Sequence, residues 1–274
     1  MTTDTFDNKT IDEYLDSLRS KGRSKNTIKA YNDDLRAALR WLSPGWCPLA
    51  DLPDLATRYI NESREYLAPS TIHRRIGTLR AFMKFHDLPD SLADYRAPTG
   101  ERPTPHPLPE GTDGVLRMMD AARQPHHAAL VALCGLCGLR VSEARSITRD
   151  SFDFVRRDVL IVGKGDRRRR VPVASAAWPA IAVAIAAADE GGAGPIVPIN
   201  DRSARKAITR LAKRAGLERH VSSHDLRATF ATATYGRCLD LRVVQELLGH
   251  ASTEQTLVYV AASETTMRTA VEVT

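Results

Sequence analysis

The chain has 274 residues, of which 43% are hydrophobic and 26% are charged, and its formal net charge at pH 7 is +6. This composition is typical of a globular protein with one or two domains, and no stretch is long and apolar enough to predict a membrane-spanning helix. The polar, acidic start lacks the pattern of a secretory signal, so we expect the protein in the cytoplasm. The excess of positive charge permits nucleic-acid binding but is weak evidence for it.

The first part of the chain, residues 1–93, is predicted to be a small helical bundle. The spacing of its apolar residues indicates four helices, at about 10–22, 24–42, 55–67 and from residue 69 onward. Thr10 and Glu13 form a capping-box pattern at the first helix, and Pro69 is a favoured first-turn residue at the fourth. On the fourth helix, several charged side chains lie away from the apolar stripe and are interpreted as a solvated face: His73, Arg74, Arg75, Arg80 and Lys84.

A proline-rich stretch separates this bundle from the rest of the chain. Prolines stand at positions 98, 103, 105, 107 and 109. Such spacing excludes a helix interior and favours an extended backbone, so residues 94–109 are predicted to be a linker.

The remainder, residues 110–274, is predicted to be mostly helical with one small antiparallel sheet. In residues 152–173, β-branched runs flank a tight turn at residues 163–166. We therefore expect a mainly α, two-domain protein whose C-terminal domain contains this sheet.

The cysteines and known motifs give no indication of a metal or a nucleotide cofactor. Cys134 and Cys137 form a C-x-x-C pair, but no second pair stands at metal-binding spacing, and the surrounding run is apolar. We interpret both as reduced, buried packing residues. We see no H-E-x-x-H, EF-hand or Walker A pattern.

Tyr259 could be either a packing residue or a nucleophile. A phenol has a pKa of about 10, so only about one in a thousand is ionised at pH 7. A reactive tyrosine therefore needs a base and a group that holds an electrophile. Alone, Tyr259 is more typical of helix packing, on a helix that Ser252 and Gln255 are predicted to cap.

Possible partners of Tyr259 occur at several places in the C-terminal part. His224 and Arg227 share one helix face after a cap at Ser222 and Asp225. The others are Arg140 with Glu143 three residues later, Lys164 in the predicted turn, and His250 after the helix-stop residue Gly249. Each alone has an ordinary structural interpretation, as a surface ion pair, a solvated turn or a core histidine.

Together these residues suit the cleavage of a phosphodiester. Its anionic oxygens repel a nucleophile until they are neutralised, and guanidinium groups do this with paired hydrogen bonds at any working pH. A histidine can take the phenol proton, and a lysine can protonate the departing oxygen. Since one phosphodiester replaces another, the step needs no ATP.

The ordered series Arg140, Lys164, His224-x-x-Arg227, His250 and Tyr259 resembles the tyrosine recombinase (phage integrase) family. The strings "GLRVSEA", "GKGDRRRRVPV", "HDLRATFAT" and "DLRVVQELLGHAS" are similar to the family's motifs, and so is the spacing of nine between His250 and Tyr259. Two N-terminal strings, "RSKNTIKAYNDDLRAALRWL" and "APSTIHRRIGTLRAFMKF", resemble its helical core-binding domain more weakly. Ala228 departs from the pattern, because the family often has a second histidine there.

The resemblance implies a role for each residue. Tyr259 attacks the scissile phosphate and forms a 3′-phosphotyrosyl link. Arg140 and Arg227 hold the non-bridging oxygens with help from His250, and Glu143 supports the arginines. Lys164 acts as the general acid, and His224 acts as a base or orients the site. No metal or other cofactor is implied.

The resemblance also implies partners. The substrate is double-stranded DNA with a short core site of inverted repeats in a bacterial or phage-infected cell. A dimer binds each site, a tetramer joins two sites through a Holliday junction, and a directionality factor can assist. The candidate DNA-contact residues are Arg74, Arg75, Arg80, Lys84, Arg202, Lys206 and Arg210.

Four interpretations of the function stay open. The leading interpretation is integration or excision of a phage or mobile element, and a chromosome-dimer (Xer-type) recombinase is the second. A non-cleaving DNA-binding regulator and a type IB topoisomerase-like enzyme are less favoured. The complete series of six residues argues against the regulator, and the matching core-binding domain argues against the topoisomerase.

Overall fold

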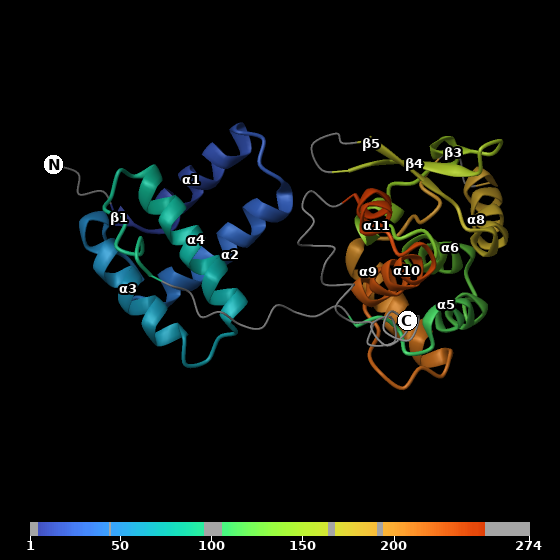
Figure 1. Cartoon of the computed structure of the whole chain (residues 1–274). Coiled ribbons are helices and arrows are strands. Elements are labelled where there is room, and N and C mark those ends of the chain that lie inside the picture. The colour runs from blue at the N-terminus through green and yellow to red at the C-terminus, as the bar shows by residue number, and fades with distance from the viewer. Residues whose placement is uncertain (1–4, 44, 96–105, 164–167, 191–193, 250–274) are drawn as a thin grey trace. The chain divides into compact units, whose positions relative to one another are not determined.

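The computed structural model describes residues 5–43, 45–95, 106–163, 168–190 and 194–249 (Figure 1). The chain divides into two compact units, Met1–Arg102 and Pro103–Thr274. Among the described residues, no helix has the length and apolar character needed to cross a membrane.

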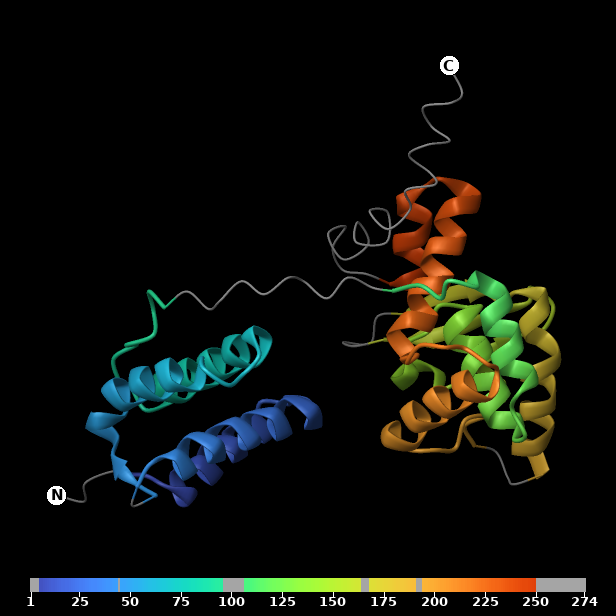
Figure 2. The same cartoon turned by 90° about the horizontal axis from the view of Figure 1, so that it is seen from below.

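Unit 1 is the helical bundle that the sequence predicts. It contains α1 (Asn8–Ser20), α2 (Lys25–Trp41), α3 (Leu52–Ser63), α4 (Pro69–Phe85), the 3-10 turn η1 (Leu49–Asp51) and a short antiparallel pair, β1 (Thr5–Phe6) with β2 (Cys47–Pro48). Both views show α1 and α2 side by side (Figures 1 and 2). Phe6 and Tyr14 pack edge-on against Phe82, so aromatic contacts join the first strand, α1 and α4.

Two helix boundaries in unit 1 differ from the prediction. Asp7, rather than Thr10, caps α1: its carboxylate accepts from the Thr10 N–H at 2.9 Å, while the Thr10 hydroxyl accepts from the Asp7 N–H at 3.1 Å. Thr10 is thus the third residue of the helix, where it completes the capping box. The third helix runs from Leu52 to Ser63 rather than from 55 to 67, because Pro53 fits its first turn.

Unit 2 is mostly helical and contains one three-stranded sheet. Its elements are α5 (Gly111–Asp120), α6 (Pro125–Gly135), α7 (Val141–Ala144), η2 (Arg149–Ser151), β3 (Phe152–Asp153), β4 (Asp158–Val162), β5 (Arg168–Pro172), η3 (Ser175–Ala177), α8 (Trp178–Glu190), α9 (Asp201–Arg214), α10 (Ser223–Cys238) and α11 (Leu241–Leu248). The strands pair antiparallel in the order β3-β4-β5, which confirms the predicted sheet. Of the turn predicted at residues 163–166, all but Gly163 lies outside the described residues.

The core of unit 2 surrounds α6, which packs against α5, α8, α9 and α10 (Figure 1). Cys134 and Cys137 are fully buried in this core, as predicted. Burial raises the pKa of each thiol to about 12, so both stay protonated and unreactive. Within the described part of the chain, no cluster of three or more His, Cys, Asp or Glu side chains could hold a metal ion.

Candidate active site

The start of α10 places two of the predicted site residues. The Ser222 hydroxyl accepts from the Asp225 N–H at 3.3 Å, and the Asp225 carboxylate accepts from the Ser222 N–H at 2.7 Å, so the predicted cap is confirmed. The cap fixes His224 in the first turn, where its side chain is exposed. Arg227 follows one turn later and is only 3% exposed.

Backbone carbonyls compensate the burial of the Arg227 guanidinium. Nη1 donates to the carbonyl of Gly138, and Nη2 donates to the carbonyl of Leu248 at 2.7 Å. Nη1 also lies 3.9 Å from the Glu143 carboxylate. Arg227 therefore connects α10 to the loop after α6 and to the last residue of α11. The two carbonyls give its buried charge the hydrogen-bond acceptors that it needs. Figures 1 and 2 both show α10 and α11 side by side.

Gly138 presents its carbonyl to Arg227 from a conformation that suits glycine. Its φ is +70°, and a Cβ at this position would collide with the ring of Phe230. We expect Gly138→Ala to destabilise unit 2 by about 1–3 kcal/mol, from left-handed strain and overpacking. The measurement is chemical denaturation. Gly236→Ala is the matched control, because a Cβ there meets nothing within 4 Å. Equal stability of the two variants would contradict this account.

Glu143 lies at the centre of a cluster of arginines. Its Oε1 accepts from Arg140 Nη1 at 3.0 Å, and its Oε2 accepts from the Arg140 backbone N–H at 2.8 Å. Both oxygens also accept from Arg169, at 2.9 Å each. The carboxylate is 6% exposed, whereas the Arg140 side chain is 41% exposed. Arg140, Glu143, Arg169 and Arg227 form what we call the arginine cluster.

The charge of Glu143 is maintained by these neighbours. Burial would raise the pKa of its carboxyl, but hydrogen bonds from the Arg169 guanidinium and from the Arg140 backbone N–H outweigh burial and lower that pKa. At neutral pH Glu143 is therefore ionised, and it lies between the guanidinium groups of Arg140, Arg169 and Arg227.

Arg169 is a member of the cluster that the sequence analysis missed. In the sequence it stands within the run of four arginines at residues 167–170, which does not distinguish it from its neighbours. The signal that could have singled it out is strand alternation, because Arg169 shares a face of β5 with the buried Val171.

Three predicted catalytic residues lie outside the described residues: Lys164, His250 and Tyr259. The predicted cap at Ser252 and Gln255 lies there too. The structure does describe the residue before His250: Gly249 ends α11 with a φ of +63°, which confirms the predicted helix stop.

The candidate DNA-contact residues fall into two groups. Arg202, Lys206 and Arg210 are exposed along α9. On α4, Lys84 is exposed and Arg80 pairs with Asp90 at 2.7 Å.

Arg74 and Arg75 of α4 have a buried partner within unit 1. Arg74 donates to the Asp34 carboxylate, and Arg75 Nε lies 3.8 Å from it. Burial raises the pKa of Asp34, and the Arg74 charge opposes that effect. Both arginines thus help to hold α4 on α2, and their contact with DNA stays a prediction.

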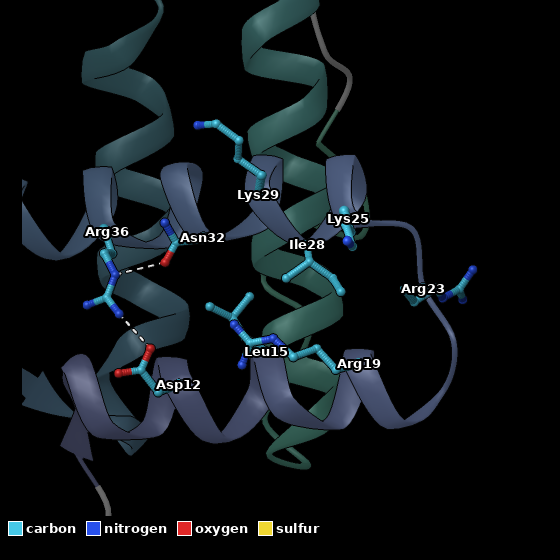
Figure 3. Close-up of a pocket in the computed structure, with 9 residues that line it drawn as sticks. All are labelled: Asp12, Leu15, Arg19, Arg23, Lys25, Ile28, Lys29, Asn32 and Arg36. Carbon is cyan, nitrogen blue, oxygen red and sulfur yellow. Dashed lines mark hydrogen bonds and ion pairs between the residues drawn. The ribbon is translucent and has the colours of Figure 1, made fainter. Parts of the chain in front are cut away.

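A basic pocket between α1 and α2 is a second feature that the sequence analysis missed (Figure 3). It has a volume of about 660 Å³ and is lined by Asp12, Leu15, Arg19, Arg23, Lys25, Ile28, Lys29, Asn32 and Arg36. Leu15 and Ile28 face each other between the helices, and Arg36 donates to Asp12 at 2.6 Å. The dense basic run at residues 19–29 was the available signal.

Comparison with known families accounts for both units. Residues 112–266 match the model described as "Phage integrase family", and residues 11–86 match "Phage integrase, N-terminal SAM-like domain". The first match alone spans more than half of the chain. The chain belongs to the phage integrase family. It is a tyrosine recombinase, as the resemblance predicted.

Curated relatives and solved structures agree with this assignment. The chain is 32% identical to tyrosine recombinase XerC of Xylella fastidiosa (strain M23) over 255 residues, which cover 87% of each chain. It is 32% identical to XerC of Rhodospirillum centenum over 268 residues, 87% of this chain and 78% of the relative.

The fold matches that of recombinases solved with DNA. The post-cleavage complex of XerH with its difH substrate matches with a TM-score of 0.69 at 17% identity, over 96% of this chain and 94% of that one. A lambda integrase dimer bound to a COC′ core site gives 0.72 at 19% identity, over 92% and 94%. These two structures confirm the predicted fold class.

Proposed function

We propose that this recombinase cleaves and rejoins DNA at a specific site through a 3′-phosphotyrosyl intermediate at Tyr259. The observation that supports this most is the arginine cluster. It brings Arg140 and Arg227, 87 positions apart in the chain, around one buried carboxylate. Such paired guanidinium groups are what a scissile phosphate needs before a nucleophile can approach.

The proposed chemistry is a transesterification. The Tyr259 oxygen forms a bond to phosphorus while the bond to the 5′-oxygen breaks, and Lys164 gives that oxygen its proton. Arg140 and Arg227 bind the non-bridging oxygens, and His250 adds a hydrogen bond. His224 takes the phenol proton or orients the site. Attack by the freed 5′-hydroxyl of another strand reverses the step, so neither ATP nor a metal is required.

The proposed substrate is double-stranded DNA in the cytoplasm of a bacterial or phage-infected cell. The XerH match is bound to a palindromic difH substrate and the lambda integrase match to a COC′ core site, which supports DNA as the partner. We propose a dimer on each short core site, a tetramer on two sites with a Holliday-junction intermediate, and a directionality factor as a further partner. The proposed domains are residues 1–93, a linker at 94–109, and residues 110–274.

We propose that α9 and α4 supply DNA contacts, through Arg202, Lys206, Arg210, Arg74, Arg75, Arg80 and Lys84. The basic pocket of unit 1 adds a further set. Five of its lining side chains are cations and only one is an anion, so it suits a phosphate of the DNA backbone.

The pocket gives a testable prediction about salt dependence. Arg23→Ala with Lys25→Ala should weaken DNA binding about tenfold at 0.1 M salt and reduce the slope of log K against log salt by about 2. Lys9→Ala with Arg40→Ala removes the same charge from α1 and α2 outside the pocket. Fluorescence anisotropy at several salt concentrations measures both. The assignment is wrong if the control pair weakens binding as much as the pocket pair.

Two biological roles remain candidates. Integration or excision of a phage or mobile element is the leading proposal from the sequence motifs. The XerC names of the curated relatives favour an Xer-type role in resolving chromosome dimers.

The test of the proposal is covalent capture. Wild-type protein is incubated with a random-sequence duplex library that contains nicks, and DNA that stays attached after denaturation is sequenced. We expect a short inverted-repeat site attached through its 3′ phosphate. A non-cleaving regulator would yield no attached DNA, and a topoisomerase-like enzyme would attach DNA without joining strands from two sites.

A further inference from the structure

We propose that Arg169 is a positioning residue for DNA cleavage, which holds Glu143 so that Arg140 and Arg227 stay available to the phosphate. This inference rests on the proposed function and extends it to a residue outside the six-residue series. It is supported by the hydrogen bonds of Arg169, the charge of the cluster and the close approach of Gly249.

All three nitrogens of the Arg169 guanidinium are used. Nη1 and Nη2 each donate to one oxygen of Glu143 at 2.9 Å, and Nε donates to the carbonyl of Leu247 at 3.1 Å. The side chain is 15% exposed. A planar guanidinium can serve a carboxylate and a carbonyl at once, whereas a lysine ammonium cannot reproduce that fork. Arg169 thus links β5, α7 and the end of α11.

The charges of the cluster explain why this link matters. Glu143 needs cationic partners because it is buried. Arg169 is one of these cations and donates two hydrogen bonds to the carboxylate. Without it, Arg140 and Arg227, which lie 3.0 and 3.9 Å from Glu143, would have to compensate more of its charge and would offer fewer donors to the substrate. With Arg169 in place, the three guanidinium groups and the carboxylate carry a formal charge of +2. That charge suits a phosphate whose negative charge increases in the transition state.

Gly249 provides independent geometric evidence. A Cβ on Gly249 would lie 2.9 Å from both Cδ and Nη1 of Arg169, closer than real Cβ contacts allow. The end of α11 therefore packs directly against the Arg169 side chain. Glycine suits this position because it has no Cβ and readily adopts a φ of +63°. His250 is the next residue in the chain, so Arg169 braces the backbone that leads to it.

The neighbour of Arg169 on β5 is a matched control. Arg170 faces the other side of the strand, is 47% exposed, and pairs with Asp158 at 2.6 Å. Arg169→Lys and Arg170→Lys are the same conservative change on adjacent positions. We compare them on a nicked suicide duplex that carries the site captured by the wild-type protein, and measure the single-turnover rate of adduct formation and the affinity for the DNA.

Arg169→Lys should lower the cleavage rate about 10- to 100-fold with little change in DNA affinity, because small displacements of positioned groups have effects of this size. Arg170→Lys should change the rate by no more than about twofold, as for other exposed ion pairs. A wild-type rate in Arg169→Lys would overturn the proposal. Absence of any wild-type adduct would instead overturn the proposed function, and this inference with it.

A second substrate separates positioning from general structural damage. In a methylphosphonate linkage, a methyl group replaces one charged oxygen, so the reaction depends less on the arginines. The defect of Arg169→Lys should shrink about tenfold on this substrate, because less charge develops for the arginines to stabilise. A defect of equal size on both substrates would overturn the proposal. If Arg169→Lys fails to fold, Gly249→Ala displaces the guanidinium without removing it, and the same rate loss and recovery are expected.

Discussion

Tyr259→Phe abolishes the covalent protein–DNA adduct and leaves DNA binding intact: this is the largest effect that the proposed mechanism predicts. Phenylalanine lacks only the phenolic oxygen that would bond to phosphorus. Loss of a nucleophile in covalent catalysis reduces rates on the order of 10⁶-fold, which places any remaining adduct below detection. The measurement is adduct formation on the captured site after denaturing electrophoresis, beside a gel-shift assay of binding.

Tyr235→Phe is the matched control for this variant. It makes the same change in unit 2, on α10, in a half-buried side chain. It should form adduct at close to the wild-type rate. An adduct that persists in Tyr259→Phe would show that another residue is the nucleophile, and the mechanism would be wrong.

Arg227→Ala has the second largest expected effect. We expect cleavage to fall about 10²- to 10³-fold, the scale found when one preorganised donor to a developing charge is removed. DNA affinity should change far less. The affinity is the sum of contacts with many phosphates, and one buried guanidinium adds little to that sum. Rates at saturating protein and equilibrium binding are measured separately.

Stability needs its own control in this experiment. Removing Arg227 leaves the carbonyls of Gly138 and Leu248 without their donor, which we expect to cost about 1–3 kcal/mol in the free energy of unfolding. Arg237→Ala removes an exposed arginine from the last turn of the same helix and should affect neither cleavage nor stability. If Arg227→Ala weakened binding as strongly as cleavage, Arg227 would be a DNA contact rather than a group that stabilises the reaction.

Local signals predicted the parts of the site that lie within one element. Ser222 and Asp225 cap α10 as expected, and Pro69 starts α4, because a cap or a first-turn proline acts within four residues. The pairing of Arg140 with Glu143 also spans only three residues. At the first helix the local pattern gave a wrong boundary. Thr10 was predicted to start the helix, but the N-cap is Asp7, three residues earlier.

The sequence by itself determined the helical bundle, the small sheet and the order of the six candidate catalytic residues, since periodicity, caps and motif spacing are local properties of the chain. Only the tertiary structure decided which charges meet. It joined Arg169 to Glu143 across 26 positions, Arg227 to Gly138 across 89 and Arg74 to Asp34 across 40. These contacts depend on which faces of separate elements pack together, and an exposed charge and a buried one look the same in sequence until that packing is known.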